Sequence, residues 1–204
     1  MVYCLFHSLM YHFNVKVRIM KKSIIILSLC YLFLLGGCDL ASQNYEEFLK
    51  PPAQQVELDE TYTNSQNGFS FKYPSSWENS PAPGTVISLL GFTDNGAITF
   101  NVVVQQFDPG MMKIPQSSFE SELKKIFSNM EFLDFKKGKF HGHPAVFMYY
   151  KCQTEDKIPV EVKQYVFNTP NKKNIVLSMG CVPNPITEDD QNLFDCILDS
   201  FQCE

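Results

Sequence analysis

Few side chains of this chain could do chemistry, and the first of them are two histidines in the sequence His141-Gly142-His143. Two imidazoles can bind Zn²⁺ or Cu²⁺, but a closed zinc site needs four ligands, and no cluster of further ligands accompanies them in the sequence. Gly142 and Pro144 indicate a turn that enters a strand. We therefore predict surface histidines in a turn, no cofactor and no metal site, with His141 and His143 kept as the weak candidates for metal ligands.

Four cysteines form the second group of reactive side chains, at Cys152, Cys181, Cys196 and Cys203. The last two are seven residues apart on a predicted helix, and the resulting rise of about 10 Å prevents a disulfide between them. The first two are predicted to lie on strands that flank a third strand, which separates them by about 9 Å. We expect one disulfide at most. No Cys-x-x-Cys is present, so a thiol oxidoreductase is not supported.

Residue patterns of the common hydrolases and nucleotide-binding enzymes are absent from the sequence. There is no Gly-x-Ser-x-Gly elbow and no glycine-rich phosphate loop. The acidic runs at Glu155-Asp156 and Glu188-Asp189-Asp190 fit a solvated turn and a helix start, and they lack the alternating ligands of an EF-hand. The sequence therefore predicts a protein that is not an enzyme.

A secretory signal is indicated near the amino terminus. Met20-Lys21-Lys22 precedes an apolar run from Ile24 to Leu35, which ends at small residues. This run is shorter than the 20 or so apolar residues that a membrane-spanning helix needs. Met1 to Ile19 add a weakly hydrophobic stretch ahead of a complete signal, so translation from Met1 and translation from Met20 both stay open.

The end of this signal, Leu35-Gly36-Gly37-Cys38, resembles the lipobox of bacterial lipoproteins. The resemblance implies that Cys38 carries a diacylglycerol thioether and becomes the first residue of the mature chain, with palmitate among its acyl groups. Two or three acyl chains anchor a protein firmly, whereas one does so only marginally. Asp39 resembles a signal for retention in the inner membrane, which slightly favours that membrane over the outer one.

The sequence divides into three parts: residues 1–37 as extension and signal peptide, 38–66 as lipidated cysteine and polar tether, and 67–204 as one folded domain. A flexible coil of about 28 residues after Cys38 would span roughly 30 Å. The alternative is a brief helix in this segment, with Tyr45, Phe48 and Leu49 on one face. Four of the 17 basic residues and none of the 22 acidic residues precede Cys38, so the mature net charge is −9 (13 − 22). This charge argues against nucleic acid as a partner.

The folded part is predicted to contain strands and two helices. Alternating residues in Phe69–Tyr73 are typical of a half-buried strand, and six more strands are expected at 86–92, 97–107, 133–140, 145–152, 159–167 and 174–182. Ser117 and Glu120 form a capping-box pattern for a helix with an apolar stripe that runs to Met130. Thr187 is expected to cap a final helix. Short connections favour an antiparallel sheet, so the fold class is α+β.

Four pieces of the sequence in this order resemble the PsbP-like fold, which includes PsbP, Mog and DcrB-type proteins: GFSFKYPSSW, an amphipathic helix, FHGHPAVFMYY, and a final helix that ends in DSF. The resemblance covers Asn67 to Gln202. It implies an antiparallel sheet of six or seven strands between helices, an α-β-α sandwich, and it implies no catalytic machinery. The photosynthetic role of PsbP and the Ran binding of Mog proteins are not expected here.

These observations predict a membrane-anchored envelope lipoprotein on the periplasmic face of a bacterial membrane. We expect it to act as a non-enzymatic protein-binding or assembly module, with the membrane contacted through its lipid and an envelope protein as partner. The alternative is a small-ligand or metal-binding lipoprotein that uses a cleft between sheet and helices near His141 and His143. The sequence does not name the partner.

Overall fold

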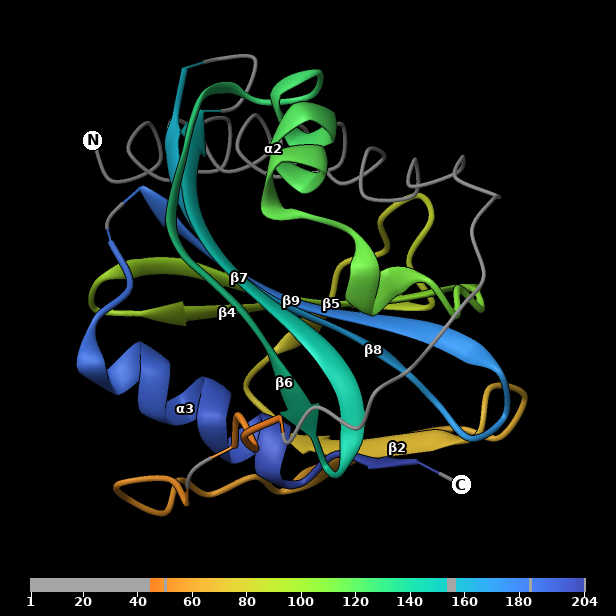
Figure 1. The fold of residues 1–204 in the computed structure, drawn as a ribbon. Coiled ribbons are helices and arrows are strands. Elements are labelled where there is room, and N and C mark those ends of the chain that lie inside the picture. The colour runs from red at the N-terminus through yellow and green to blue at the C-terminus, as the bar shows by residue number, and fades with distance from the viewer. Residues whose placement is uncertain (1–44, 50, 154–156, 184, 204) are drawn as a thin grey trace, which may run out of the picture.

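The computed structural model describes residues 45–49, 51–153, 157–183 and 185–203 (Figure 1). Cys38 and the predicted signal peptide lie outside the described residues. None of the helices in the described ranges is long and apolar enough to span a membrane. The strands are β1 (Glu60–Asn64), β2 (Phe69–Tyr73), β3 (Glu78–Asn79), β4 (Ile87–Thr93), β5 (Gly96–Gln106), β6 (Ser128–Phe140), β7 (His143–Gln153), β8 (Pro159–Asn168), β9 (Lys173–Pro183) and β10 (Gln202–Cys203), and the helices are α2 (Gln116–Lys124), α3 (Glu188–Asp199) and a short 3-10 helix at Met111–Lys113.

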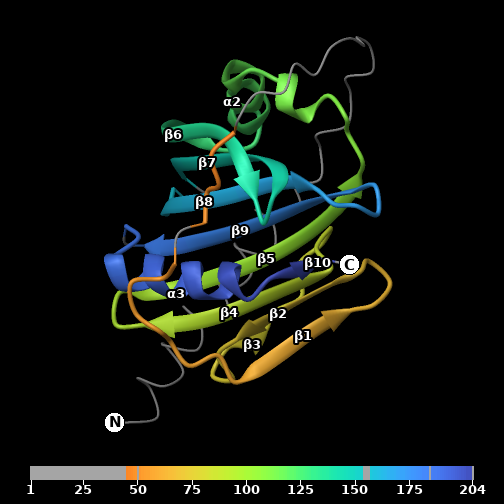
Figure 2. The ribbon, with the colours of Figure 1, turned by 60° about the horizontal axis from the view of Figure 1, so that its bottom comes forward.

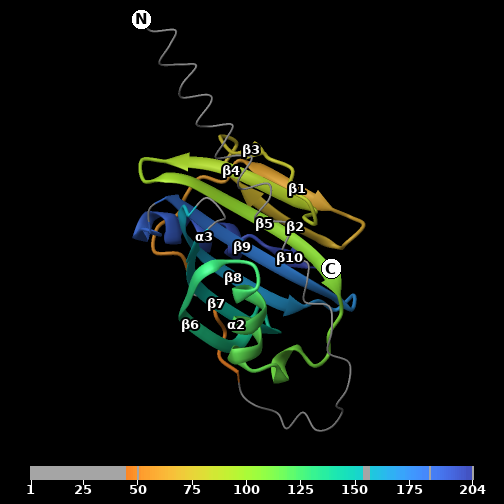
Figure 3. The ribbon, with the colours of Figure 1, turned by 90° about the horizontal axis from the view of Figure 1, so that it is seen from above.

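Seven strands form an antiparallel sheet in the order β3-β4-β5-β9-β8-β7-β6. Helix α2 lies on one face, and α3 lies on the other together with a small sheet in the order β1-β2-β10 (Figures 1 and 2). Figure 3 shows the same layers from above. The predicted α+β class and the antiparallel sheet between helices are therefore confirmed. The sequence did not indicate the small sheet, and β2 belongs to it.

The larger core fills the space between the main sheet, α3 and the small sheet. Phe71 of β2 contacts Phe100 of β5 and Phe201, with ring centroids 5.1 Å and 6.0 Å apart. All three side chains are buried. Because side chains alternate along a strand, the odd-numbered residues of β7, β8 and β9 point toward this core.

The second core lies between the main sheet and α2. Phe119 and Leu123 on α2 are buried in it. A row of four valines from neighbouring strands crosses the sheet beneath the helix, because the strand register places these residues opposite one another. The row consists of Val103, Val176, Val166 and Val146.

Helix α2 differs from the prediction at both ends. The helix begins at Gln116 with Pro115 at its N-cap, and no side chain caps it. Ser117 therefore lies inside the first turn and cannot act as the cap. Glu120 pairs with Lys124 instead. Met130 belongs to β6, because the helix ends at Lys124.

The thiols occupy separate places in the fold. Strand β8 lies between Cys152 and Cys181, as predicted, because Cys152 pairs with Val160 while Cys181 pairs with Glu161. The placement of Cys196 and Cys203 on one helix was wrong, since α3 ends at Asp199 and Cys203 lies in β10. All four described cysteines are free thiols. Burial raises the pKa of Cys152 and Cys181 to about 12, which disfavours the reactive thiolate.

The segment expected to be a polar tether differs from that expectation in its described part. Strand β1 pairs with β2 over its whole length. Residues 45–49 contact the end of β6 through a parallel bridge between Glu47 and Lys139, and they form no helix. These pieces are therefore part of the folded domain.

Candidate functional site

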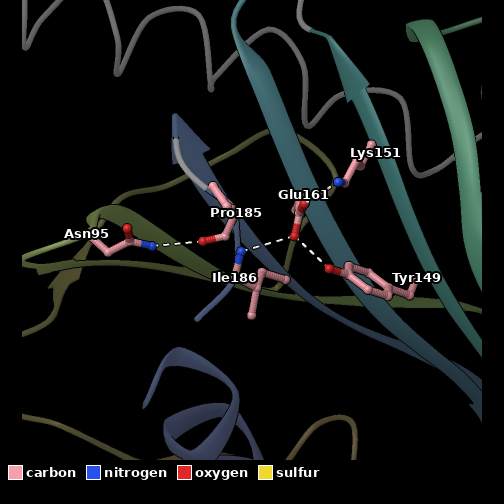
Figure 4. Close-up of polar contacts among 6 residues, drawn as sticks. All are labelled: Asn95, Tyr149, Lys151, Glu161, Pro185 and Ile186. Atoms are coloured by element: carbon pink, nitrogen blue, oxygen red, sulfur yellow. Dashed lines mark hydrogen bonds and ion pairs between the residues drawn. The ribbon is translucent and has the colours of Figure 1, made fainter. Parts of the chain in front are cut away.

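Glu161 of β8 is the centre of a polar cluster at the end of the main sheet near α3 (Figure 4). Its odd position in β8 directs the side chain to the face that carries α3, and only 6% of the residue is exposed. A buried carboxylate is unfavourable unless donors compensate for the lost water. Its partners therefore decide what this residue does.

Three groups donate to the Glu161 carboxylate. The Tyr149 hydroxyl lies 2.6 Å from Oε2, the Ile186 amide lies 3.0 Å from the same oxygen, and the Lys151 ammonium lies 3.0 Å from Oε1. Burial alone raises the pKa of this carboxyl, but the bonds from Tyr149, Ile186 and Lys151 outweigh burial and lower the pKa below its ordinary value. Glu161 is therefore ionised at neutral pH and held in place on both oxygens.

Burial also shifts the pKa values of Tyr149 and Lys163, which lie beside Glu161. Burial, and then the bond to Glu161, raise the pKa of Tyr149 well above its usual range. Lys163 lies over the Tyr149 ring at 4.9 Å from the centroid and donates to Gln191 of α3. Burial lowers the pKa of Lys163, while the nearby Asp195 opposes this change. The cluster thus connects β7 and β8 to α3.

The turn between β4 and β5 connects to the start of α3 on the other side of the cluster. Asn95 donates to the Pro185 carbonyl at 2.8 Å and to the Asp190 carboxylate at 3.1 Å. Asp190 also accepts from the Thr187 amide at 3.0 Å, and Thr187 accepts from the Asp190 amide at 3.2 Å. This pair is a capping box, which confirms Thr187 as the predicted cap of the last helix.

This arrangement suits a scaffold better than acid–base chemistry. A general base needs a free lone pair within reach of a substrate proton, and a general acid needs a pKa near the working pH. The Glu161 oxygens already receive three bonds, and the pKa of Tyr149 is too high for a phenolate at neutral pH. The cluster fixes the connection from β9 to α3 against two strands and one turn.

The two predicted histidines lie at a hairpin, as expected for turn residues. His141 and Gly142 connect β6 to β7, and both have positive φ angles, 47° and 78°. The ring Nε2 of His141 is 2.9 Å from the Leu198 carbonyl of α3. His143 is half-buried at the start of β7.

The described residues contain no group of three or more His, Cys, Asp or Glu side chains that could hold a metal ion. The backbone of the hairpin contacts a carboxylate instead. The amides of His141 and Gly142 donate to Oε1 and Oε2 of Glu47, each at 2.9 Å. Sequence reasoning missed this residue, because nothing local in residues 45–49 indicates a partner about 95 positions away.

A buried polar row crosses the opposite face of the main sheet, the face that carries α2. The register places its four side chains opposite one another on β4, β5, β9 and β8, and each is less than 5% exposed. Gln164 donates to Ser178 at 3.2 Å. Neither Asn101 Oδ1 nor Gln164 Oε1 accepts a hydrogen bond within the described chain. The row consists of Ser88, Asn101, Ser178 and Gln164.

Comparison with known proteins gives the class of fold. No protein-family model and no curated protein sequence matches the chain. Among solved structures, cyanobacterial PsbP (CyanoP) from Synechocystis sp. PCC 6803 is similar over 83% of this chain and 99% of its own, with a TM-score of 0.50 and 13% identity. The Ran-binding protein Mog1p from Saccharomyces cerevisiae is similar over 72% of this chain and 96% of its own, with a TM-score of 0.51 and 7% identity.

The chain therefore has the PsbP-like fold that CyanoP and Mog1p share. This confirms the resemblance drawn from the order of its sequence motifs. At such low identities the likeness extends to the fold alone.

Proposed function

We propose that this protein is an extracytoplasmic lipoprotein whose PsbP-like domain binds or helps to assemble another envelope protein without catalysis. The observation that carries the proposal is the engagement of Glu161: its carboxylate is ionised and bound by Tyr149, Ile186 and Lys151. The buried acid–base groups of this cluster thus hold the connection from β9 to α3 in place. Mog1p is a Ran-binding protein, so at least one protein of this fold binds another protein.

Anchoring rests on the sequence from Met20 to Cys38. The short apolar run, the two lysines before it and the lipobox-like end together support export and lipidation. The mature net charge of −9 disfavours electrostatic attachment to an anionic bilayer, so the acyl chains would supply the membrane contact. Asp39 favours the inner membrane.

The lipid anchor is tested by metabolic labelling with an alkyne analogue of palmitate. The wild-type protein should incorporate the label and sediment with membranes, whereas Cys38→Ser should lose the label. Cys4→Ser and Cys30→Ser are matched controls, since both cysteines precede the predicted cleavage site. A wild-type protein that stays unlabelled and soluble would refute the anchor.

The protein-binding role is tested by photo-crosslinking in intact cells. The large exposed hydrophobic side chains of the described residues are Phe92, 52% exposed, and Leu133, 39% exposed. A photoreactive amino acid at either position should give a discrete crosslinked protein that is absent when it replaces Lys124 on the exposed side of α2. Absence of any discrete product at all exposed positions sampled around the domain would contradict a stable partner.

A further inference from the structure

Residues Tyr45–Leu49, here named the strap, lie along the edge of the main sheet at β6, close to the carboxyl end of that strand (Figure 1). The Phe48 amide donates to the Lys139 carbonyl at 2.8 Å, and the Lys139 amide donates to the Glu46 carbonyl at 2.8 Å. Strand β6 is the last strand of the sheet on this side. The strap therefore covers part of an edge whose backbone groups would otherwise lack a neighbouring strand.

The Glu47 carboxylate binds the hairpin next to this edge. Because His141 and Gly142 both have positive φ angles, their consecutive amides can point toward one acceptor. Each amide donates to a different Glu47 oxygen at 2.9 Å. Hydrogen bonds to an ionised acceptor are about twice as strong as neutral ones. These two hydrogen bonds thus connect the strap to the turn between β6 and β7.

The aromatic ring of the strap is half-buried and packs against the larger core. Phe48 lies 6.1 Å from Phe147 and 5.9 Å from Tyr165, measured between ring centroids. Strand β6 leaves room for it at Gly138, where a Cβ would lie 2.5 Å from the Phe48 ring and 2.6 Å from the Glu46 carbonyl oxygen. A side chain at position 138 and a docked strap are therefore incompatible without a shift of the backbone. The edge of β6 is shaped for this segment.

We infer that the strap holds the β6 edge of the domain toward the bilayer, an orientation that rests on the proposed lipid anchor at Cys38. Tyr45 is seven residues beyond Cys38. Seven residues reach at most about 24 Å when fully extended and average about 15 Å as a flexible coil. If the chain were free up to β1, the 22 residues from Asp39 to Glu60 would average about 26 Å.

The strap therefore shortens the chain between the lipid anchor and the folded domain, and it fixes the edge at which this chain joins the domain. Six strand spacings across a seven-stranded sheet amount to about 29 Å. With its attachment at β6, the domain keeps this edge and the hairpin near the lipid surface, and the opposite edge at β3 lies farther from it. The surface that fits the bilayer is thus the β6 edge.

The orientation can be measured on the full lipidated protein in phosphatidylcholine vesicles that contain a nitroxide-labelled phosphatidylcholine. A fluorescent amino acid replaces either Lys136 on β6 or Glu78 on β3, both of which have side chains that reach solvent. Quenching should be several-fold stronger at position 136 than at position 78. Glu47→Ala, alone or with Phe48→Ala, should bring the two values together.

Glu46→Ala is the matched control, because it removes one carboxylate from the same segment and keeps the backbone carbonyl that pairs with Lys139. It should preserve the difference in quenching. Equal quenching at both positions in the wild type, or a difference that Glu47→Ala leaves unchanged, would overturn the inference. The proposed function would still stand if the protein remained lipidated.

Hydrogen exchange provides a readout that does not depend on membranes. In detergent-solubilised Cys38→Ser protein, the amides of His141 and Gly142 should be protected, and Glu47→Ala should remove this protection while Glu46→Ala preserves it. Rapid exchange of both amides in the parent protein would refute the docked strap. Failure of palmitate labelling with normal protection would refute the anchor and the orientation that rests on it, while the strap would remain.

Discussion

Removal of the Tyr149 hydroxyl is the sharpest test of the Glu161 cluster. Tyr149→Phe deletes the donor at 2.6 Å from Glu161 Oε2 and leaves the Ile186 amide and Lys151 in place. A hydrogen bond to a charged group contributes about 1.5–3 kcal/mol, so the free energy of unfolding at pH 7 should fall by about 2 kcal/mol. Urea denaturation followed by the fluorescence of Trp77, the single and buried tryptophan, measures this change.

The pH dependence of this difference identifies its source. The folded-state pKa of Glu161 is lowered, so its stabilisation is present above the unfolded-state pKa of about 4.3 and is lost as the pH falls through the folded-state value. Tyr149→Phe removes one of the hydrogen bonds that lower the pKa of Glu161, so the folded-state pKa of Glu161 rises in this variant. The gap in stability between the two proteins should therefore be largest above about pH 5 and shrink in acid.

Tyr73→Phe in the small sheet is the matched control, since it makes the same chemical change on a half-buried tyrosine of β2. It should alter stability by much less than Tyr149→Phe. If the two variants behave alike at pH 7, or if the effect of Tyr149→Phe grows as the pH falls, the account of the Glu161 cluster fails.

Three further changes test other parts of the fold by the same denaturation assay. Gly138→Ala should cost about 1–3 kcal/mol because its Cβ meets Phe48 and Glu46, and a neutral result would contradict the docked strap. Thr187→Ala should cost about 1 kcal/mol through loss of the capping box at α3, and circular dichroism should show a shorter helix if the cap is lost. Gln164→Met should stay within about 1 kcal/mol of the wild type, because it removes an unpaired acceptor along with one bond to Ser178; a larger loss would mean that the Gln164 oxygen has a partner.

The elements predicted from short sequence patterns largely agree with the structure. Alternation in Phe69–Tyr73 predicted β2 with its observed bounds, and Thr187 with its acidic first turn predicted α3. These signals are local, because a strand buries every second residue and a helix start needs a nearby acceptor. The capping-box pattern at Ser117 gave a wrong prediction, because α2 begins one residue earlier, at Gln116, with Pro115 at its N-cap.

The candidate site could not be predicted in the same way. Glu161 meets the Ile186 amide 25 positions away, and Glu47 meets the hairpin at His141 from 94 positions away. Such pairs depend on strand order and register, and a slip of one residue would turn each side chain to the other face of the sheet.

The sequence alone determined the class of fold, the absence of recognised enzyme motifs and the expectation of a lipid anchor at Cys38, because each is encoded in contiguous residues. Only the tertiary structure decided that β2 lies in the small sheet, that Cys203 lies in β10 and outside the last helix, and that residues 45–49 pair with the edge of β6. The physical reason is that these outcomes come from packing between distant segments, where Phe48 fits only because strand β6 carries glycine at position 138.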